Sequence, residues 1–407
     1  MKELNYARLA LMRGVNLQKG QTLVVSTPLW TADFAHLLME EAFALGARDV
    51  VIRYDEPQAE RIRLLHAPEE ALCDVPRWMS ESQTCYADRD AAYLRISSAK
   101  PGMMDGVDAA RLGMRQRALN APLRAFNLRR MANEVAWSVI CVPNAEWAQQ
   151  VYPGRDAQVA LDALWEDMYS CCYVTEESPV AGWDAHVENM QRMVRRLNGL
   201  KPVALHLKNG LGTDLHLRMC EEGVFAGGIC HCPEPDGVCF APNIPTEEIL
   251  TTPHRLSAEG VVVNTLPLVY NGSLIDRFRL TFRNGEVTDW SCEVGAELLR
   301  GILEMDEGSR RLGEVALVPY DSPIRRTGVL FYNTLFDENA SCHLALGAGY
   351  VDVLHGKDRS EAALIAQGLN TSMLHVDFMF GSSDMRCTVE TAAGEHVDVF
   401  RDGVFVL

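Results

Sequence analysis

The pattern of hydrophobic positions changes near the middle of the chain. In the first half, short continuous apolar runs alternate with segments whose apolar residues recur at helical spacing. A helix is predicted over 34–45, where Gly46 follows as a stop signal. Strands are predicted at 21–26, 49–54, 91–96 and 136–142. Because uninterrupted apolar strands separated by helices are typical of parallel sheets covered on both faces, residues 1–200 are predicted to form a doubly wound, mostly parallel α/β domain.

The second half alternates apolar with polar residues and carries strong hairpin signals. An amphipathic helix is predicted over 183–197, and the segment 206–217 that follows alternates in the manner of a half-buried strand. Asn284-Gly285 and Asp402-Gly403 lie between apolar runs, and such pairs are the strongest short signals for hairpin turns. Residues 201–407 are therefore predicted to form an α+β domain rich in antiparallel strands and hairpins.

The predicted parallel sheet lacks a nucleotide-binding signature. No Gly-x-Gly-x-x-Gly follows the first strand, and no Walker Gly-x₄-Gly-Lys-Ser/Thr occurs anywhere in the sequence. We therefore predict that the first domain is a scaffold, or a wall on the substrate side, and does not bind a cofactor.

Composition narrows the class of protein and its surroundings. With 48% apolar and 23% charged residues the chain has the make-up of a globular protein, and its net charge of −17 disfavours general nucleic-acid binding. No apolar run is long enough to span a bilayer, and the N-terminal residues lack the apolar core of a secretory signal. Twelve cysteines without such a signal indicate reduced thiols, so we expect a cytoplasmic protein. Cys230, Cys232 and Cys239 lack the usual zinc spacing and are predicted to be free thiols.

The strongest local signal for chemistry is His375 with Asp377. They flank a valine in the apolar run 373–380, which predicts a strand. Since residues two apart on a strand point to the same face, one imidazole and one carboxylate should project together. This pair alone does not distinguish a site for one ion from a site for two.

Three further residues extend the candidate site: Glu248, Glu314 and His343. Five nitrogen and oxygen ligands with three carboxylates suit two divalent ions that share a carboxylate or a water, whereas a structural zinc prefers four ligands that often include thiolates. Each also has an ordinary interpretation. Glu248, or equally Glu247, suits the first turn of a helix; Glu314 suits an exposed strand end; and His343 suits a hydrogen-bonded core position near a helix. Neither His-Glu-x-x-His nor Gly-x-Ser-x-Gly occurs.

Longer segments around these residues carry a family resemblance. They are Gly-Val-Asn-Leu-Gln-Lys-Gly-Gln (14–21), Asn-Ile-Pro-Thr-Glu-Glu (243–248), Gly-Glu-Val-Ala-Leu-Val-Pro-Tyr (313–320), Asn-Thr-Leu-Phe-Asp-Glu-Asn-Ala-Ser-Cys-His-Leu-Ala-Leu-Gly (333–347) and His-Val-Asp-Phe-Met (375–379). They resemble the signature segments of the aminopeptidase T, aminopeptidase S and PepS family of cocatalytic metallo-aminopeptidases. The resemblance extends over most of the chain. This sequence departs from the family's pattern in two places, the cysteine-rich segment 220–239 and a one-residue insertion within 351–370.

The resemblance implies a set of roles. The family's metal ligands match Glu248, Glu314, His343, His375 and Asp377, and a tyrosine near the metals matches Tyr350. It implies hydrolysis of N-terminal residues from short peptides by water activated between two divalent ions, zinc in the first place, with cobalt, manganese or magnesium as alternatives. Glu248 or Glu314 would act as general base, and Tyr350 would hydrogen-bond the oxyanion or pack behind the site. The family is commonly dimeric, so a homodimer is expected.

Several alternatives stay open at this point. The substrate α-amine could bind a metal, Asp337 or Glu338, although those two residues could instead cap a helix carrying His343. Ring-cleaving dihydroxypyridine dioxygenases resemble this family, and His343, His375 and Asp377 alone would form the facial triad of a mononuclear iron site. Retention of both glutamates favours two metals. A binding protein without catalytic activity is the third possibility.

Overall fold

The computed structural model describes residues 1–98, 100–233, 237–270, 273–355 and 360–407. It consists of two compact units, one formed by Met1–Asp184 with Ile229–Ile244 and the other by Ala185–Gly228 with Pro245–Leu407. The division into domains at residue 200 stays a prediction. Parts of the cysteine-rich segment and of the segment expected to hold an insertion lie outside the described residues.

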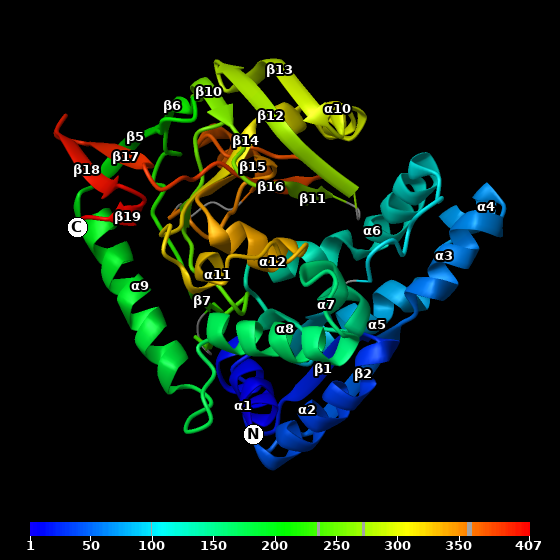
Figure 1. Cartoon of the computed structure of the whole chain (residues 1–407). Helices are drawn as coiled ribbons and strands as arrows, with labels where there is room; N and C mark the ends of the chain where they lie inside the picture. Colours follow the sequence, from blue (N-terminus) through cyan, green and yellow to red (C-terminus); the bar gives the residue numbers. More distant parts are fainter. Residues whose placement is uncertain (99, 234–236, 271–272, 356–359) are drawn as a thin grey trace. The chain divides into compact units, whose positions relative to one another are not determined.

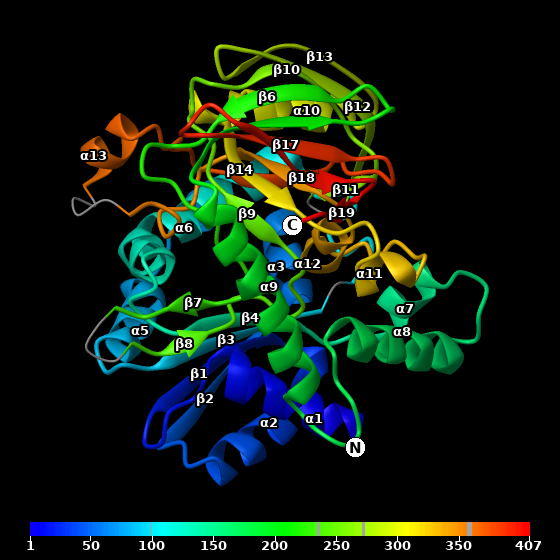
Figure 2. The same ribbon diagram turned by 90° about the vertical axis from the view of Figure 1, so that its left-hand side faces the viewer.

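The first unit contains a parallel sheet of β1 (Thr22–Pro28), β2 (Asp49–Asp55), β3 (Ala92–Ser97) and β4 (Trp137–Cys141). Their spatial order is β2-β1-β3-β4, and neighbouring strands are parallel; Figure 1 labels β1 and β2, and Figure 2 labels all four strands. From β1 the chain moves to one side for β2 and to the other side for β3, so right-handed crossovers carry helices to both faces. The predicted strands all overlap the observed ones, and the α/β fold class is confirmed.

Helices of the first unit begin and end at residues that suit helix termini. Asp108, Asn144 and Asp156 each accept hydrogen bonds from backbone N–H groups of the first turn that follows. Gly46 follows the predicted helix and has φ of 96°, which glycine adopts without steric cost. The helices are α1 (Lys2–Leu9), α2 (Ala32–Ala44), α3 (Pro57–His66), α4 (Glu69–Cys73), α5 (Arg77–Ala87), α6 (Ala109–Met131), α7 (Ala145–Val151) and α8 (Ala157–Cys171), and the short strands β7 (Cys230–His231) and β8 (Cys239–Phe240) pair with each other.

The second unit contains a large antiparallel sheet (Figure 2). Its order is β11-β12-β10-β6-β5-β17-β18-β19, and β13 also pairs with β12. Alternate residues of β5 and β6, including Leu205 and Leu215, point into a core shared with Met190 and Val194 of α9 (Ala181–Gly199). The strands are β5 (Pro202–Lys208), β6 (Asp214–Arg218), β10 (Glu259–Val263), β11 (Leu268–Tyr270), β12 (Ser273–Arg283), β13 (Glu286–Val294), β17 (Arg386–Thr391), β18 (His396–Arg401) and β19 (Val404–Phe405).

Both predicted hairpin turns are confirmed. Asn284 and Gly285 connect β12 to β13 with φ of 50° and 78°, and Asp402 and Gly403 connect β18 to β19 with φ of 50° and 75°. Two successive positive φ angles define the turn whose twist matches that of paired strands, which explains the preference for these residue pairs.

A smaller antiparallel sheet of the second unit has the order β16-β15-β14-β9. One of its faces, formed by residues such as Val315, Leu344 and Phe378, belongs to the same buried core. Its strands are β9 (Ile249–Thr251), β14 (Leu312–Leu317), β15 (His343–Gly347) and β16 (His375–Met379), and the helices of this unit besides α9 are α10 (Ala296–Leu303), α11 (Pro323–Arg326), α12 (Thr334–Asp337) and α13 (Glu361–Ala366). Throughout the described ranges, no helix combines the length and the apolar character that crossing a membrane would require.

Candidate metal centre

The small sheet gathers the predicted ligands on the face away from the core. Glu314 on β14 is directly opposite Ala345 on β15, and Ala345 is opposite Asp377 on β16. Directly opposed residues of antiparallel strands share a face, so the two carboxylates flank Ala345. His343 and His375 lie two residues before Ala345 and Asp377, which places both imidazoles on that face as well.

Small residues leave room between these ligands. Gly347 is opposite His375, and Ala316 is opposite His343, while Ala345 occupies the centre of the ligand-bearing face. A larger side chain at Ala345 or Ala316 would project on the ligand-bearing face. A Cβ at Gly347 would instead lie 2.2 Å from the carbonyl oxygen of Leu374, so this position requires glycine. Long polar side chains with small alanine and glycine residues between them on one face of the sheet are therefore suited to binding ions.

The side chain of Glu248 lies on the same face, but its backbone does not have the expected helical conformation. The sequence favoured the first turn of a helix after Pro245, but residues 245–248 are not helical and Glu248 directly precedes β9. Position in the sequence alone did not distinguish Glu247 from Glu248, and only the family resemblance favoured Glu248. In the structure, Glu248 lies beside His343, whereas an oxygen of Glu247 is 3.7 Å from His186 on α9.

The ligand atoms form two groups that share Glu314. Glu248 Oε2 is 3.1 Å from His343 Nε2, which is also 3.7 Å from Glu314 Oε1. The other oxygen of Glu314, Oε2, is 3.1 Å from His375 Nε2, which is 3.2 Å from Asp377 Oδ1. In each group, formed by Glu248, Glu314 and His343 or by Glu314, His375 and Asp377, the ligand atoms lie within 4.8 Å of one another.

Backbone carbonyls orient both imidazoles. His343 Nδ1 lies 2.9 Å from the carbonyl oxygen of Glu338 and 3.1 Å from that of Ser341, and His375 Nδ1 lies 2.7 Å from the carbonyl oxygen of Ala348. Donation of the Nδ1 proton to a carbonyl leaves Nε2 facing the carboxylates, as is usual for metal-binding histidine. The tautomer that suits a metal is thus fixed by the backbone.

Two converging atoms lack the partner that burial normally requires. Although His375 Nε2 and Asp377 Oδ1 are at ion-pair distance, their contacts do not have hydrogen-bond geometry, and both atoms are buried without a hydrogen-bond partner among the described residues. Buried polar atoms are nearly always satisfied. A divalent cation would satisfy both, so these residues fit the metal that their types imply.

The charges of the group perturb its titration. Burial lowers the pKa of His343 and of His375, but the neighbouring carboxylates together outweigh burial and raise both pKa values well above the ordinary value. Burial raises the pKa of Glu314, yet the two imidazoles reverse this effect and bring the pKa to about 2. Burial raises the pKa of Glu248 above its ordinary value despite His343. In the absence of a cation, bound protons therefore offset the negative charge of the carboxylates. A cation that binds here must displace those protons.

Tyr350 and Glu338 lie at the edge of the same group. The ring of Tyr350 is 4.9 Å from the ring of His375 and meets it edge-on. Burial, followed by the charges of Glu314 and Asp377, raises the pKa of Tyr350, so its hydroxyl stays a donor. Burial, followed by the charges of Asp377 and Glu248, also raises the pKa of Glu338 well above its ordinary value.

The structure corrects the expected surroundings of His343. This residue begins strand β15 and is not carried by a helix, and Cys342 beside it contacts the backbone of Val318. Asp337 accepts hydrogen bonds from the N–H groups of Phe331 and Asn333, and so orders the turn before α12. Asp337 is thus engaged by the backbone, whereas Glu338 is influenced by the charges of the predicted ligands Asp377 and Glu248.

Comparison with known proteins identifies the family. The model of the family described as thermophilic metalloprotease (M29) matches residues 2–405. The chain belongs to the M29 family. It is 39% identical over 399 residues to aminopeptidase AmpS of Bacillus subtilis, covering 98% of this chain and 97% of that one, and 39% identical over 404 residues to aminopeptidase 2 of Geobacillus stearothermophilus, covering 99% and 97%.

A solved structure of an M29 relative has the same fold. Wild-type AmpT from Thermus thermophilus superimposes with a TM-score of 0.92 at 35% identity, covering 100% of this chain and 99% of that one. These matches confirm the resemblance and the predicted class of enzyme, a metal-dependent aminopeptidase. None of them supports the dioxygenase alternative.

Proposed function

We propose that the protein removes N-terminal residues from short peptides with the help of two divalent cations held by Glu248, Glu314, His343, His375 and Asp377. The observation that carries this proposal is the position of Glu314, whose two carboxylate oxygens each face a different imidazole. One shared carboxylate between two three-residue groups is the arrangement expected of a pair of ions with a bridging ligand.

The cations and the protein contribute different chemistry. When bound, two divalent cations would polarise the scissile carbonyl and lower the pKa of water toward neutrality. Imidazole and carboxylate donors suit zinc, and cobalt and manganese are close alternatives. Glu314 belongs to both ligand groups and is assigned as a ligand, whereas Glu248 belongs to one group only and is assigned the proton transfer.

In the proposed reaction Glu248 acts as general base and then as general acid. It accepts a proton from the attacking water and delivers that proton to the leaving amine, which closes the proton balance of peptide hydrolysis. The Tyr350 hydroxyl donates a hydrogen bond to the oxyanion of the tetrahedral intermediate. Loss of one such donor costs about 3 kcal/mol in comparable sites.

Recognition of the free α-amine is assigned to Glu338. Of the two acidic residues considered for this role, Asp337 is occupied by backbone amides, while Glu338 shares the electrostatic environment of Asp377 and Glu248. A buried carboxylate is stabilised by a cationic partner, which a free N-terminus supplies and an acylated one does not. A homodimer and short peptides as substrates complete the proposal on the strength of family resemblance. The cytoplasmic location rests on the reduced thiols expected of the twelve cysteines.

The decisive experiment combines metal analysis with substrates that differ only at the amine. The purified chain is stripped with chelator, reloaded with zinc or cobalt, and assayed on aminoacyl chromogenic amides and on their N-acetylated forms. We expect two ions per chain whose binding depends on Glu314, and cleavage of the free amides alone. A single iron per chain without amide cleavage would favour the oxygenase, and equal cleavage of acetylated amides would overturn the assignment of an aminopeptidase.

A further inference from the structure

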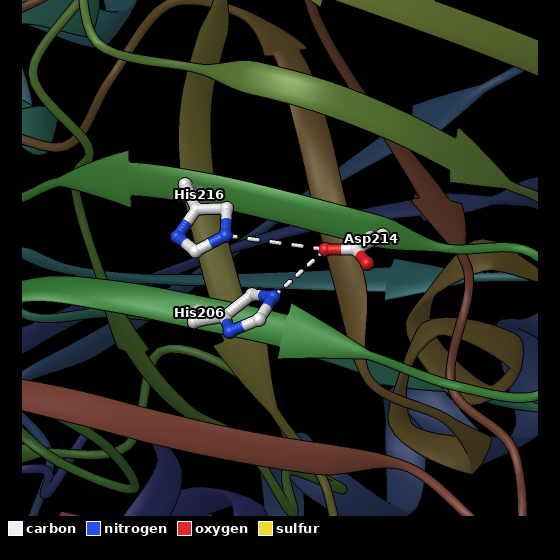
Figure 3. A group of neighbouring side chains, drawn as sticks. All are labelled: His206, Asp214 and His216. Atoms are coloured by element: carbon white, nitrogen blue, oxygen red, sulfur yellow. Dashed lines mark hydrogen bonds and ion pairs between the residues drawn. The ribbon is translucent and has the colours of Figure 1, made fainter. Parts of the chain in front are cut away.

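A second group of ligand-type side chains lies on the large sheet. His206 on β5 and Asp214 and His216 on β6 point toward one another (Figure 3). The residues next to them in sequence, such as Leu205 and Leu215, point into the core, so the group occupies the opposite, solvent-facing side of the sheet. It shares no residue with the Glu314-centred site and belongs to a different sheet.

Strand register fixes this arrangement. His206 is directly opposite His216, and Lys208 is directly opposite Asp214. The hairpin connection is tied down by Asn209, whose side chain accepts hydrogen bonds from the N–H groups of Leu211 and Thr213. Because paired strands and a closed turn hold the Cα positions, little conformational entropy would be lost when an ion binds.

The distances are those of converging ligands. His206 Nε2 is 2.7 Å from Asp214 Oδ1, and His216 Nε2 is 4.0 Å from the same oxygen. The two imidazole rings stack with centroids 3.7 Å apart and planes 17° apart. One ligand atom from each residue lies within 4.8 Å of the other two.

We propose that His206, Asp214 and His216 bind one transition-metal ion of the zinc and copper type, at a site independent of the peptidase centre. Two imidazoles and one carboxylate favour such ions over magnesium or calcium, which prefer oxygen ligands. Three protein ligands leave a coordination position for water or for an exogenous ligand.

The surrounding charges are compatible with an ion. Lys208 Nζ is 2.9 Å from Asp214 Oδ2 and therefore engages the carboxylate oxygen that does not face the imidazoles. Glu259, opposite His216 on β10, adds negative charge next to the site.

The test measures zinc binding to the intact chain by equilibrium dialysis, in wild type and in His216→Ala. A matched control is His396→Ala, since His396 is also exposed on this sheet and is opposite Glu390, but belongs to none of the ligand groups found among the described residues. We expect His216→Ala to lose one equivalent of zinc, or to bind it at least about tenfold more weakly, while His396→Ala binds as wild type does. Peptidase activity should be unchanged in both.

Copper provides a spectroscopic criterion that does not depend on the peptidase. Electron paramagnetic resonance of a chain carrying both His343→Ala and His375→Ala should still show a copper signal with nitrogen coupling, and adding His216→Ala should remove one nitrogen from it. The proposal is overturned if His216→Ala and His396→Ala bind zinc equally, or if the nitrogen coupling is the same with and without His216. A failure of the peptidase proposal would leave both readouts intact.

Discussion

Replacement of Glu314 by glutamine tests whether one carboxylate serves both ions. Glutamine keeps the size of the side chain but removes its charge and turns one oxygen into a donor. The two oxygens of Glu314 lie 3.7 and 3.1 Å from the imidazoles of His343 and His375. In the ion-free protein, where both imidazoles are protonated, unit charges at these distances interact by roughly 4 to 5 kcal/mol each at an effective dielectric constant of about 20, so this single carboxylate is strongly coupled to both sides.

The expected result is a difference in stoichiometry. Glu314→Gln should weaken the binding of both ions by at least about 100-fold, because Glu314 belongs to both ligand groups. Glu248→Gln and Asp377→Asn should each weaken the binding of mainly one ion, since Glu248 and Asp377 each belong to one ligand group. The assay is equilibrium dialysis with elemental analysis, accompanied by a thermal melt that reports folding.

Glu247→Gln is the matched control. Glu247 is a buried glutamate adjacent to Glu248, but it lies beside His186 and belongs to neither ligand group. It should retain both ions. If Glu314→Gln lost one ion only, with the other bound as in wild type, the bridging role of Glu314 would be refuted.

Three further predictions follow from the geometry. Tyr350→Phe should lower kcat by roughly 100-fold, equivalent to about 3 kcal/mol, with both ions retained; an unchanged kcat would assign Tyr350 to packing. The pKa values of His343 and His375 are raised above the ordinary value in the ion-free protein, so both are protonated near neutrality. Ion binding must then release protons and tighten as pH rises, which calorimetry in buffers of different ionisation enthalpy measures; a pH-independent affinity across neutrality would contradict this. Gly285→Ala should destabilise the second unit by more than about 2 kcal/mol in denaturant unfolding, because its Cβ would lie 2.0 Å from the carbonyl oxygen of Arg255. Gly394→Ala, at a similar φ with open space around it, is the control and should cost less.

Local patterns predicted those parts of the fold that depend on local physics. The parallel strands and the two positive-φ turns are determined by residues adjacent in sequence, and both were predicted correctly. The pairing of His375 with Asp377 follows from the two-residue period of a strand, and it too was visible.

The positions of the remaining predicted ligands depend on pairings between distant segments. Glu314 was compatible with an exposed strand end, but β14 is flanked by β9 and β15, and this makes it an interior strand. His343 follows a short helix that ends before it, and no local period marks the change to a strand. Glu248 could be preferred to Glu247 only through family resemblance, because both lie on an irregular segment whose direction is set by β9.

The strand origin of the ligands has a consequence for metal exchange. Adjacent strands are held about 4.8 Å apart by backbone hydrogen bonds, so the spacing between the two ligand groups is a property of the sheet. Such a scaffold cannot expand or contract to suit an ion, as a mobile loop would. Substituting zinc by cobalt or manganese should therefore leave the positions of Glu314, His343 and Asp377 nearly unchanged. Differences in turnover between metals would then report the Lewis acidity and preferred coordination of each ion, and not a rearrangement of the protein.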